Sequence, residues 1–359
     1  MNSWEMWRNN LESKFEIHPL EIIQWEATRK CDLNCVHCGS PKEGAINKEL
    51  DTAEIVNAFR EIKRDVQPVD FKFVTITGGE PFLRKDLLQV LAEIKKLGWI
   101  TTIQTNGNWL AKNSERITEL IELNVRGIGL DLDGPEKVHD QFRQKEGHFQ
   151  QTVALAKKLL KHNDILHTTI TTVVTSSNFQ CLNEMWDIIS DLNPHRWRLL
   201  PIESVGRAEK NDLRLQPEQY RKLIEFVREK RIQNISQKHS VQIELGCIGW
   251  LGPKIEGWVR PYIWSCIAGR TCLGILYDGS LSACAHIDRG FVQGNVREKN
   301  IAQTWMRKYK IFREERPKPS LCAECDQANY CTLPMHKLCA SGEMRDCAHL
   351  TYKKGGEKL

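Results

Sequence analysis

The cysteines of this chain are the feature that most constrains its fold. The 359-residue sequence contains 13 cysteines. Three lie within residues 31–38, eight lie between 266 and 347, and only Cys181 and Cys247 stand elsewhere. A chain of this length can bury a sizeable core and needs no covalent staples. Thiols clustered at short, fixed spacings therefore indicate ligands of metal ions or iron–sulfur clusters.

The composition is that of an ordinary globular protein. Hydrophobic residues make up 41% of the chain and charged residues 27%, and no apolar run is long enough to span a bilayer. The first residues contain acids where a secretion signal needs an apolar core, so we expect a cytoplasmic protein without a membrane partner. The net charge of +5 does not indicate a nucleic-acid partner. Thiolates bound to three clusters would bring that charge to about zero.

Strand-like and helix-like segments alternate from residue 21 to residue 235. Six β/α units of about 30–35 residues predict parallel strands joined by crossover helices. The expected fold class is α/β, a partial (β/α)6 TIM-like barrel, because six units are too few for a closed eightfold barrel. A doubly wound open sheet is the alternative. The expected strands are 21–28, 72–77, 99–105, 126–134, 167–175 and 196–202, and the expected helices are 51–66, 86–98, 113–124, 149–162, 181–192 and 217–231. A capping box of Asp51 and Glu54 is expected at the start of the helix 51–66, and Gly98 is expected to end the helix 86–98.

The sequence changes in character after residue 236. Apolar runs become short and are interrupted by Gly, Pro and Cys, with one helical segment at 299–313. This texture is typical of a domain held together by metal clusters. The predicted division is an N-terminal extension at 1–20, a barrel at 21–235, an irregular cysteine-rich domain at 236–350 and a flexible tail at 351–359.

Two motifs follow the first two expected strands. Cys31, Cys35 and Cys38 form a CxxxCxxC run after the first strand. Three thiolates on one loop can bind three irons of a cubane and leave the fourth iron open, although a zinc loop lacking its fourth ligand is the alternative. The second strand ends in residues 77–81, Thr-Gly-Gly-Glu-Pro. Its glycines allow close approach of backbone to a ligand, and Glu80 can contact an amino group there.

These motifs together resemble the radical S-adenosylmethionine (SAM) superfamily. The resemblance implies that the amino and carboxylate groups of SAM chelate the open iron. His37 departs from the family, which usually has an aromatic residue before the last cysteine. The resemblance continues through later strand ends and an HDxxR-like segment, whose arginine typically reaches the SAM carboxylate. The cofactor-binding residues that it implies are Gly78, Gly79, Glu80, Pro81, Asn106, Asp131, Asp133 and Arg143.

The C-terminal cysteines resemble a SPASM domain, which holds two auxiliary clusters. A GxxxxC step ends at Cys284, and a CxxCxxxxxC run begins at Cys322. Spacing alone would also suit zinc. The family usually has a cysteine where Met335 stands, so Cys339 is the expected substitute; without it the nearer cluster has an open iron. The implied ligands are Cys266, Cys272, Cys284 and Cys339 for the nearer cluster and Cys322, Cys325, Cys331 and Cys347 for the outer one.

The resemblance also implies the chemistry. SAM and three [4Fe-4S] clusters would serve a reductive cleavage that yields methionine and a 5′-deoxyadenosyl radical, which takes a hydrogen atom from the substrate. Most SPASM relatives act on peptides or proteins. The leading substrate is therefore a ribosomally made precursor peptide that receives a crosslink, an epimerised residue or a backbone excision. Cys247, outside every cluster motif, is a candidate hydrogen donor, and a plain buried cysteine is its alternative.

Three other functions stay open. A sulfatase-type maturase is one, although that branch typically has an aspartate where Ala285 follows Cys284. A small-molecule radical SAM oxidase, for example of a tetrapyrrole, is the second, and a non-enzymatic iron–sulfur or zinc scaffold is the third. Few residues precede the first strand, so we expect a separate small protein to bind the leader peptide. The expected electron donor is a flavodoxin or ferredoxin.

Overall fold

The computed structural model describes residues 6, 18–40, 49–66, 73–236, 240–298, 300–314, 319–323, 325–328, 330–339, 341 and 343–354. Most of the predicted extension at 1–20 and the end of the predicted tail lie outside these residues. The chain divides into two compact units. The first comprises Met1–Lys30, Glu43–Thr102 and Ser265–Arg345, and the second comprises Cys31–Lys42, Ile103–Trp264 and Asp346–Leu359.

The first unit combines the first β/α elements with the cysteine-rich segment. Its strands run in the order β10-β9-β8-β1-β2, in which β1 pairs in parallel with both β2 and β8, and β9 is antiparallel to its two neighbours. The strands are β1 (Ile22–Glu26), β2 (Phe73–Thr77), β8 (Cys272–Ile275), β9 (Ser280–Ser282) and β10 (Gly294–Asn295), and the helices are α2 (Thr52–Asp65), α3 (Leu87–Lys96), α12 (Ile301–Arg307) and α13 (Lys310–Arg313). β3 (Ile100–Gln104) crosses the boundary between the two units.

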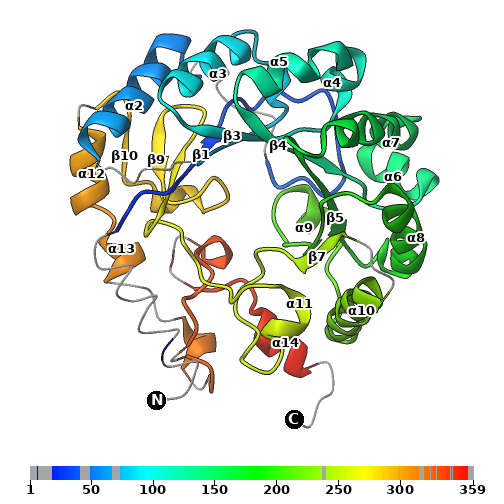
Figure 1. The fold of residues 1–359 in the computed structure, drawn as a ribbon. Helices are drawn as coiled ribbons and strands as arrows, with labels where there is room; N and C mark the ends of the chain where they lie inside the picture. Colours follow the sequence, from blue (N-terminus) through cyan, green and yellow to red (C-terminus); the bar gives the residue numbers. More distant parts are fainter. Residues whose placement is uncertain are drawn as a thin grey trace. The chain divides into compact units, whose positions relative to one another are not determined.

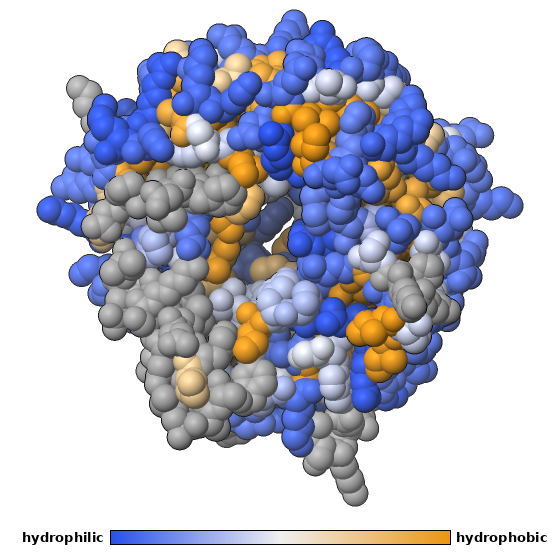
Figure 2. Space-filling view, in the orientation of Figure 1, coloured by the Kyte–Doolittle hydropathy of each residue, from blue (hydrophilic) through white to orange (hydrophobic). Residues whose placement is uncertain are grey.

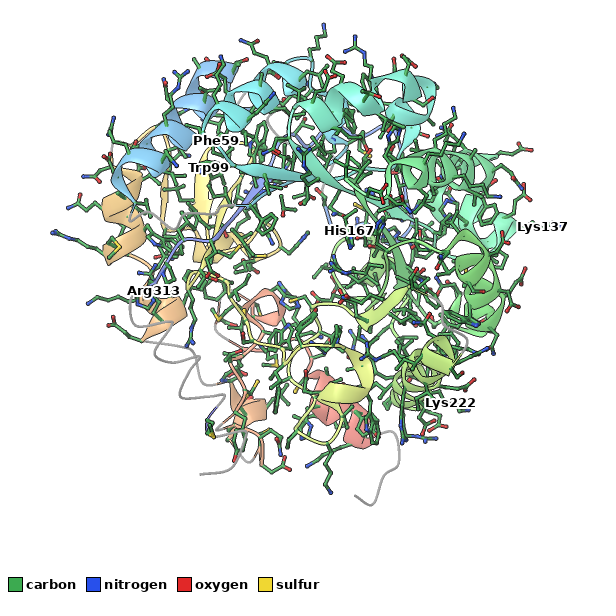
Figure 3. The ribbon with its side chains drawn as sticks, viewed as in Figure 1. Phe59, Trp99, Lys137, His167, Lys222 and Arg313 are labelled. Atoms are coloured by element: carbon green, nitrogen blue, oxygen red, sulfur yellow. The ribbon has the colours of Figure 1, made fainter. Side chains whose placement is uncertain are left out.

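Local sequence explains the helices of the first unit. The expected capping box of α2 is present, because Asp51 accepts from the backbone N–H of Glu54, and Glu54 accepts from that of Asp51. Gly98 has the positive φ of 77° that ends α3 as predicted. The rings of Phe59 and Trp99 meet edge to face, with centroids 5.9 Å apart (Figure 3). α12 packs beside α2, as Figure 1 shows.

The second unit holds four further parallel strands. They run in the order β4-β5-β6-β7 and are parallel at each junction. The strands are β4 (Val125–Asp131), β5 (His167–Val174), β6 (Arg196–Pro201) and β7 (Gln242–Leu245), and the helices are α4 (Asn108–Lys112), α5 (Ile117–Glu122), α6 (Glu136–Arg143), α7 (His148–Leu159), α8 (Leu182–Leu192), α9 (Arg207–Lys210), α10 (Pro217–Ser236), α11 (Glu256–Val259) and α14 (Ala348–Lys354).

Aromatic packing joins strands and helices in this unit. Trp197 of β6 stacks on Trp186 of α8 and meets Phe226 of α10 edge to face. Its indole N–H donates to the hydroxyl of Thr172, so its one polar atom is satisfied within the core. Figure 2 shows hydrophilic side chains over most of the outer surface of α6, α7 and α8. That distribution is expected of amphipathic helices whose apolar faces pack on strands.

The predicted α/β class with mainly parallel strands is confirmed. All six predicted strands are present, with ends within three residues of their expected positions. No strand was predicted after residue 202, so the sequence analysis missed β7 to β10. These strands have at most four residues each, which is too short for a periodic pattern to stand out. None of the helices among the described residues is both long and apolar enough to cross a bilayer.

Candidate active site

The segment that carries Cys31, Cys35 and Cys38 is a loop fixed by hydrogen bonds from other parts of the second unit. Val36 N–H donates to Phe142 O at 3.0 Å. Arg207 contacts the loop twice, because its Nε donates to Cys35 O at 2.7 Å and its backbone N–H to Cys38 O at 3.2 Å. A loop without regular structure is therefore held at several points, which preorganises ligands.

The three thiols of this loop lie within electrostatic reach of one another. Cys35 is buried, and burial raises its pKa to about 11; charge on Asp133, Cys38 and Cys31 raises it further, while Arg143 lowers it. A buried thiol favours its proton unless a nearby positive charge stabilises the thiolate. The cationic iron of a cluster supplies that charge, so the donor set fits an iron–sulfur site.

Arg143 links this thiol to two aspartates that follow β4. Its Nη1 lies 3.7 Å from Cys35 Sγ. Its Nη2 lies 2.5 Å from Asp133 Oδ2 and 3.1 Å from Asp131 Oδ2. Burial raises the pKa of Asp133 to about 6, although Arg143 opposes that effect, and both aspartates raise the pKa of Arg143 above its usual range. The structure thus brings three of the predicted cofactor-binding residues together with a predicted iron ligand.

Two buried histidines lie next to the group formed by Arg143, Asp131 and Asp133. His139 Nδ1 lies 3.1 Å from the backbone N of Asp133, and its Nε2 lies 2.7 Å from Nδ1 of His148. His148 Nε2 in turn lies 3.0 Å from Asn106 O. Burial lowers the pKa of His139 to about 2 and that of His148 to about 4, with Arg143 acting in the same direction. Both imidazoles are therefore neutral at pH 7, and together they form a hydrogen-bonded chain between the backbone of Asp133 and that of Asn106.

Asn106, another predicted cofactor-binding residue, lies beside the cysteine loop. Its Nδ2 donates to Asp32 Oδ1 at 2.7 Å and lies 3.9 Å from Cys31 Sγ. Asp32 also accepts from Asn108 Nδ2 at 2.9 Å, and Lys145 contacts the side-chain oxygen of Asn108. Polar groups thus surround one side of the loop, where a charged small molecule would find hydrogen-bond partners.

His37 occupies the position where the family usually has an aromatic residue. Its ring stacks on Phe142 with centroids 4.5 Å apart and planes 11° from parallel. Burial lowers the pKa of His37 well below its usual value, so the ring is uncharged at pH 7. The neutral imidazole therefore packs as a flat aromatic ring. His37 can thus stack on Phe142 as the aromatic residue usual in the family would.

The glycine-rich motif lies in the first unit, packed on the segment that leads into Cys31. Gly79 N–H donates to Thr28 O and Glu80 N–H to Lys30 O, both at 2.7 Å. A Cβ on Gly78 would lie 2.4 Å from Thr28 O, and one on Gly79 would lie 2.1 Å from Lys30 O. Local packing thus requires both glycines. Glu80 is fully buried, and its carboxylate accepts from Phe82 N–H at 3.1 Å beside Pro81.

Several of the predicted auxiliary ligands lie within the first unit. Cys266 is buried, and its backbone N–H donates to Thr332 Oγ1 at 2.6 Å, which joins it to the residue after Cys331. Cys272 is the first residue of β8 and is 1% exposed. Cys284 Sγ lies 3.1 Å from Gln24 Oε1, and Cys339 Sγ lies 3.0 Å from Glu343 O. Met335, where the family has a cysteine, is fully buried in the core.

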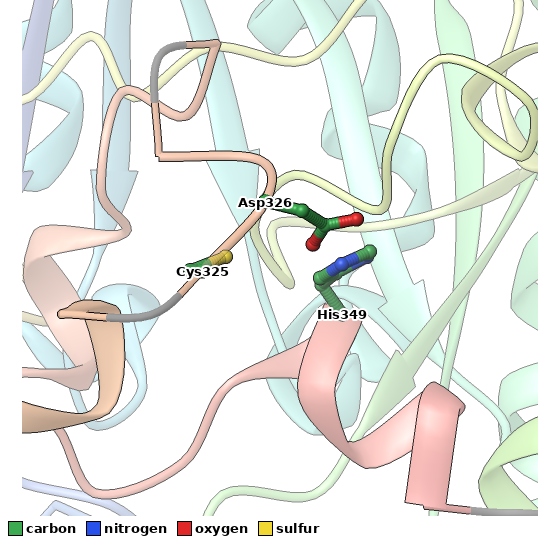
Figure 4. Close-up of side chains that lie close together, drawn as sticks. All are labelled: Cys325, Asp326 and His349. Atoms are coloured by element: carbon green, nitrogen blue, oxygen red, sulfur yellow. The ribbon is translucent and has the colours of Figure 1, made fainter.

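The remaining predicted residues occupy different elements. Cys322 and Cys325 are joined by a turn in which Cys325 N–H donates to Cys322 O, and Figure 4 shows Cys325 with its neighbour Asp326. His349 of α14, also drawn in Figure 4, lies 3.1 Å from Leu251 O within the second unit. Cys347 directly precedes α14. Cys247 follows β7 and is exposed, so its alternative interpretation as a buried cysteine is wrong.

Three residues of the site were missed in the sequence analysis. Arg207 lies in the 201–208 segment that follows β6, and that strand end was the signal that could have found it. Asp32 lies inside the cysteine motif, where its position between two ligands gave no sign of its role. His148 opens α7 after Gly147 and resembled an ordinary helix residue.

Comparison with known proteins defines the class. Residues 25–189 match the family described as the radical SAM superfamily, and residues 266–326 match the SPASM family, an iron–sulfur cluster-binding domain. The chain therefore belongs to the radical SAM superfamily and to its SPASM-containing subgroup. As such it is a radical SAM enzyme that binds SAM and iron–sulfur clusters.

Particular relatives cover most of the chain. An AdoMet-dependent heme synthase of Methanosarcina barkeri is 24% identical over 358 residues, which are 94% of this chain and 94% of that protein. A heme synthase of Oleidesulfovibrio alaskensis is 25% identical over 86% of this chain and 81% of its own length. Among solved structures, anSMEcpe with bound AdoMet and the Cp18Cys peptide is 17% identical, with a TM-score of 0.71. The match covers 94% of this chain and 95% of that chain. SuiB of Streptococcus suis bound to S-adenosylmethionine is 20% identical, with a TM-score of 0.64, and the match covers 89% of this chain and 75% of that chain.

Proposed function

We propose that this chain is a radical SAM oxidase whose substrate is an iron tetrapyrrole with carboxylate side chains. The observation that carries the proposal is the similarity to AdoMet-dependent heme synthases, which runs through both family domains and over 94% of both chains in one case. The SuiB and anSMEcpe structures compared above are 20% and 17% identical and support the fold alone. This substrate was the small-molecule alternative in the sequence analysis.

The residues of the second unit support binding of the cofactors. Cys31, Cys35 and Cys38 would hold the SAM-binding cluster, and Arg143 stands beside Cys35 as a cation for a carboxylate. When bound, the cluster and SAM supply a radical that removes a hydrogen atom from the substrate. The protein residues hold the loop, pair Asp131 and Asp133 with Arg143 and position polar groups around the site. Two auxiliary clusters, and so three clusters in all, remain our prediction for the eleven cysteine ligands.

A ribosomally made precursor peptide remains the second candidate substrate. It is favoured by the similarity of fold to SuiB, one structure of which contains the precursor peptide SuiA. A separate leader-binding protein and a flavodoxin or ferredoxin donor belong to this proposal. A reducing, cytoplasmic location suits both candidates, because clustered thiols oxidise elsewhere.

One anaerobic experiment separates the two candidates. The reconstituted protein is analysed for iron and sulfide, reduced and then assayed for 5′-deoxyadenosine with iron coproporphyrin III, or with precursor peptides encoded near its gene. About twelve irons per chain are expected for three cubanes. Formation of 5′-deoxyadenosine coupled to a change in mass of the tetrapyrrole supports the proposal. Coupling to a peptide alone would replace it with the second candidate, and no SAM cleavage at all would exclude both.

A further inference from the structure

A row of polar side chains crosses the four strands of the second unit. The strand register pairs Asp131 with Thr171, Thr171 with Arg198 and Arg198 with Glu244. The next row toward the amino ends of the strands contains Thr169, Arg196 and Gln242. Residues paired in a parallel sheet point to the same side, so both rows lie on one face of the sheet. We call this face the inner face.

The inner face is opposite to the face of the sheet on which α8 and α10 pack. Trp197 lies between the two arginines in sequence and therefore points to the other side, where it packs on α8 and α10. The side chains of Arg196 and Arg198 are each 29% exposed, although both extend from β6, which has a neighbouring strand on each side. His167, labelled in Figure 3, also lies on the inner face, two residues before Thr169.

The charges of Arg196, Arg198 and Glu244 do not balance. Two guanidinium groups share one carboxylate oxygen, because Arg196 Nε lies 3.6 Å and Arg198 Nε 3.3 Å from Glu244 Oε1. The other oxygen of Glu244 accepts from Gln242 Nε2 at 2.9 Å. Burial and the two arginines lower the pKa of His167 to about 4, so this histidine adds no charge at pH 7. One positive charge is thus left over.

Most N–H donors of Arg196 and Arg198 also lack hydrogen-bond acceptors among the described residues. Within the part of the chain that the structure describes, neither arginine donates a hydrogen bond from its Nη atoms, and Arg196 Nε has no hydrogen-bond partner. A guanidinium group presents five N–H donors in a planar fork that matches a carboxylate. Partly desolvated donors without acceptors are unfavourable in a native protein unless a ligand or water satisfies them.

The position of this pair relative to the cluster loop follows from the register. Arg198 and Asp131 lie in the same row two strands apart, which places their backbones about 10 Å from each other. Asp131 contacts Arg143, which in turn contacts Cys35. The arginine pair is therefore separated from Asp131 and the candidate active site by only a short distance along the inner face.

We propose that Arg196 and Arg198 form an anion subsite that binds a carboxylate of the substrate. This inference rests on the proposed function and deepens it, because it assigns residues to a carboxylate side chain of the tetrapyrrole. Bidentate arginine–carboxylate contacts fix orientation as well as supplying affinity. The pair therefore determines which part of the substrate is presented toward Asp131 and Arg143.

The first test measures binding of iron coproporphyrin III and of its tetramethyl ester by the change in porphyrin absorbance. Arg198→Gln weakens binding of the free acid by about ten- to hundredfold and leaves binding of the ester unchanged. Arg116→Gln, the same substitution at an exposed ion pair with Glu119, changes neither. Equal affinity of the wild-type chain and Arg198→Gln for the free acid would overturn the proposal. Circular dichroism checks that Arg198→Gln is folded, which is expected because Glu244 keeps its contact with Arg196 in that variant.

A second test does not depend on any tetrapyrrole. The arginine reagent phenylglyoxal is applied with and without glutarate, and each modified residue is quantified by mass spectrometry. Glutarate slows modification of Arg196 and Arg198 at least twofold and leaves Arg116 unchanged. Absence of this protection would overturn the subsite. If the wild-type chain binds no porphyrin and glutarate still protects the pair, the tetrapyrrole function fails while the carboxylate subsite stands.

Discussion

Two nitrogens of Arg143 share a single oxygen of Asp133. Nε lies 2.6 Å and Nη2 2.5 Å from Oδ2, while Oδ1 accepts from Val173 N–H at 2.9 Å. The carboxylate is fully buried, so its charge depends on this guanidinium group. The same group reaches Cys35. Asp133 is therefore best described as the residue that positions Arg143, and Arg143 as the residue that contacts the cysteine loop.

The first prediction concerns this pair. Arg143→Gln is expected to lower the free energy of unfolding of the metal-free protein by about 3–5 kcal/mol, because it leaves a buried carboxylate without its cation. Chemical denaturation under anaerobic conditions measures the effect. The double variant Arg143→Gln with Asp133→Asn should recover part of the loss. Arg116→Gln, at an exposed pair, should cost less than about 1 kcal/mol; a comparable loss in both single variants would contradict the argument.

The second prediction concerns acid stability. Because burial lowers the pKa of His148 to about 4, the unfolded chain takes up a proton between pH 6.5 and pH 4 that the folded chain does not. The contribution of His148 to stability is thus complete above pH 6.5 and falls with the pH by about 1.4 kcal/mol per unit. His148→Gln should flatten the pH dependence of unfolding in this window by that amount.

The matched control for this pH dependence is His162→Gln, at a half-buried histidine outside the network. It tests whether any histidine substitution has the same effect. Denaturation curves at several pH values give the slopes for the three proteins. An unchanged slope in His148→Gln would show that this histidine takes up no extra proton on unfolding.

The third prediction concerns the glycine-rich motif. A Cβ on Gly79 would lie 2.1 Å from the backbone oxygen of Lys30, so Gly79→Ala must displace the segment that leads into Cys31. We expect a loss of at least about 1–3 kcal/mol, together with reduced iron in the reconstituted protein. Gly257→Ala is the control, because no atom lies within 4 Å of its added methyl group. Equal stability of the two variants would mean that the tight packing at Gly79 is not essential.

The sequence predicted those parts of the fold that depend on local patterns. The capping box of Asp51 and Glu54 and the stop at Gly98 are local, and both are confirmed. β8 could not be found in this way, since Cys272–Ile275 becomes a strand by pairing with Ile22–Trp25, some 250 residues earlier. Short strands in a cysteine-rich segment carry no periodic signal, and their partners decide their structure.

The candidate site, like the fold, could be predicted from the sequence only in part. Motif spacing pointed to Cys31, Cys35 and Cys38, and the family resemblance to Asn106, Asp133 and Arg143; the structure brings these residues together. Neither could indicate the inner-face arginines, since an isolated RWR in a strand has many ordinary interpretations. Only the register, which aligns Arg198 with Glu244 and Asp131, gives the pair its position.

The last prediction concerns Arg207, the residue that anchors the cysteine loop from α9. Its side chain and backbone donate to Cys35 O and Cys38 O, so Arg207→Gln removes a charged hydrogen bond and leaves the loop freer to open. We expect the reconstituted protein to release iron to a chelator roughly tenfold faster, with little change in thermal stability, because the loss is local. Lys210→Gln, at the exposed end of the same helix, should release iron at the wild-type rate. Equal rates in all three proteins would show that the cysteines alone hold the loop, whereas parallel losses of iron and of thermal stability would show a role in global folding instead.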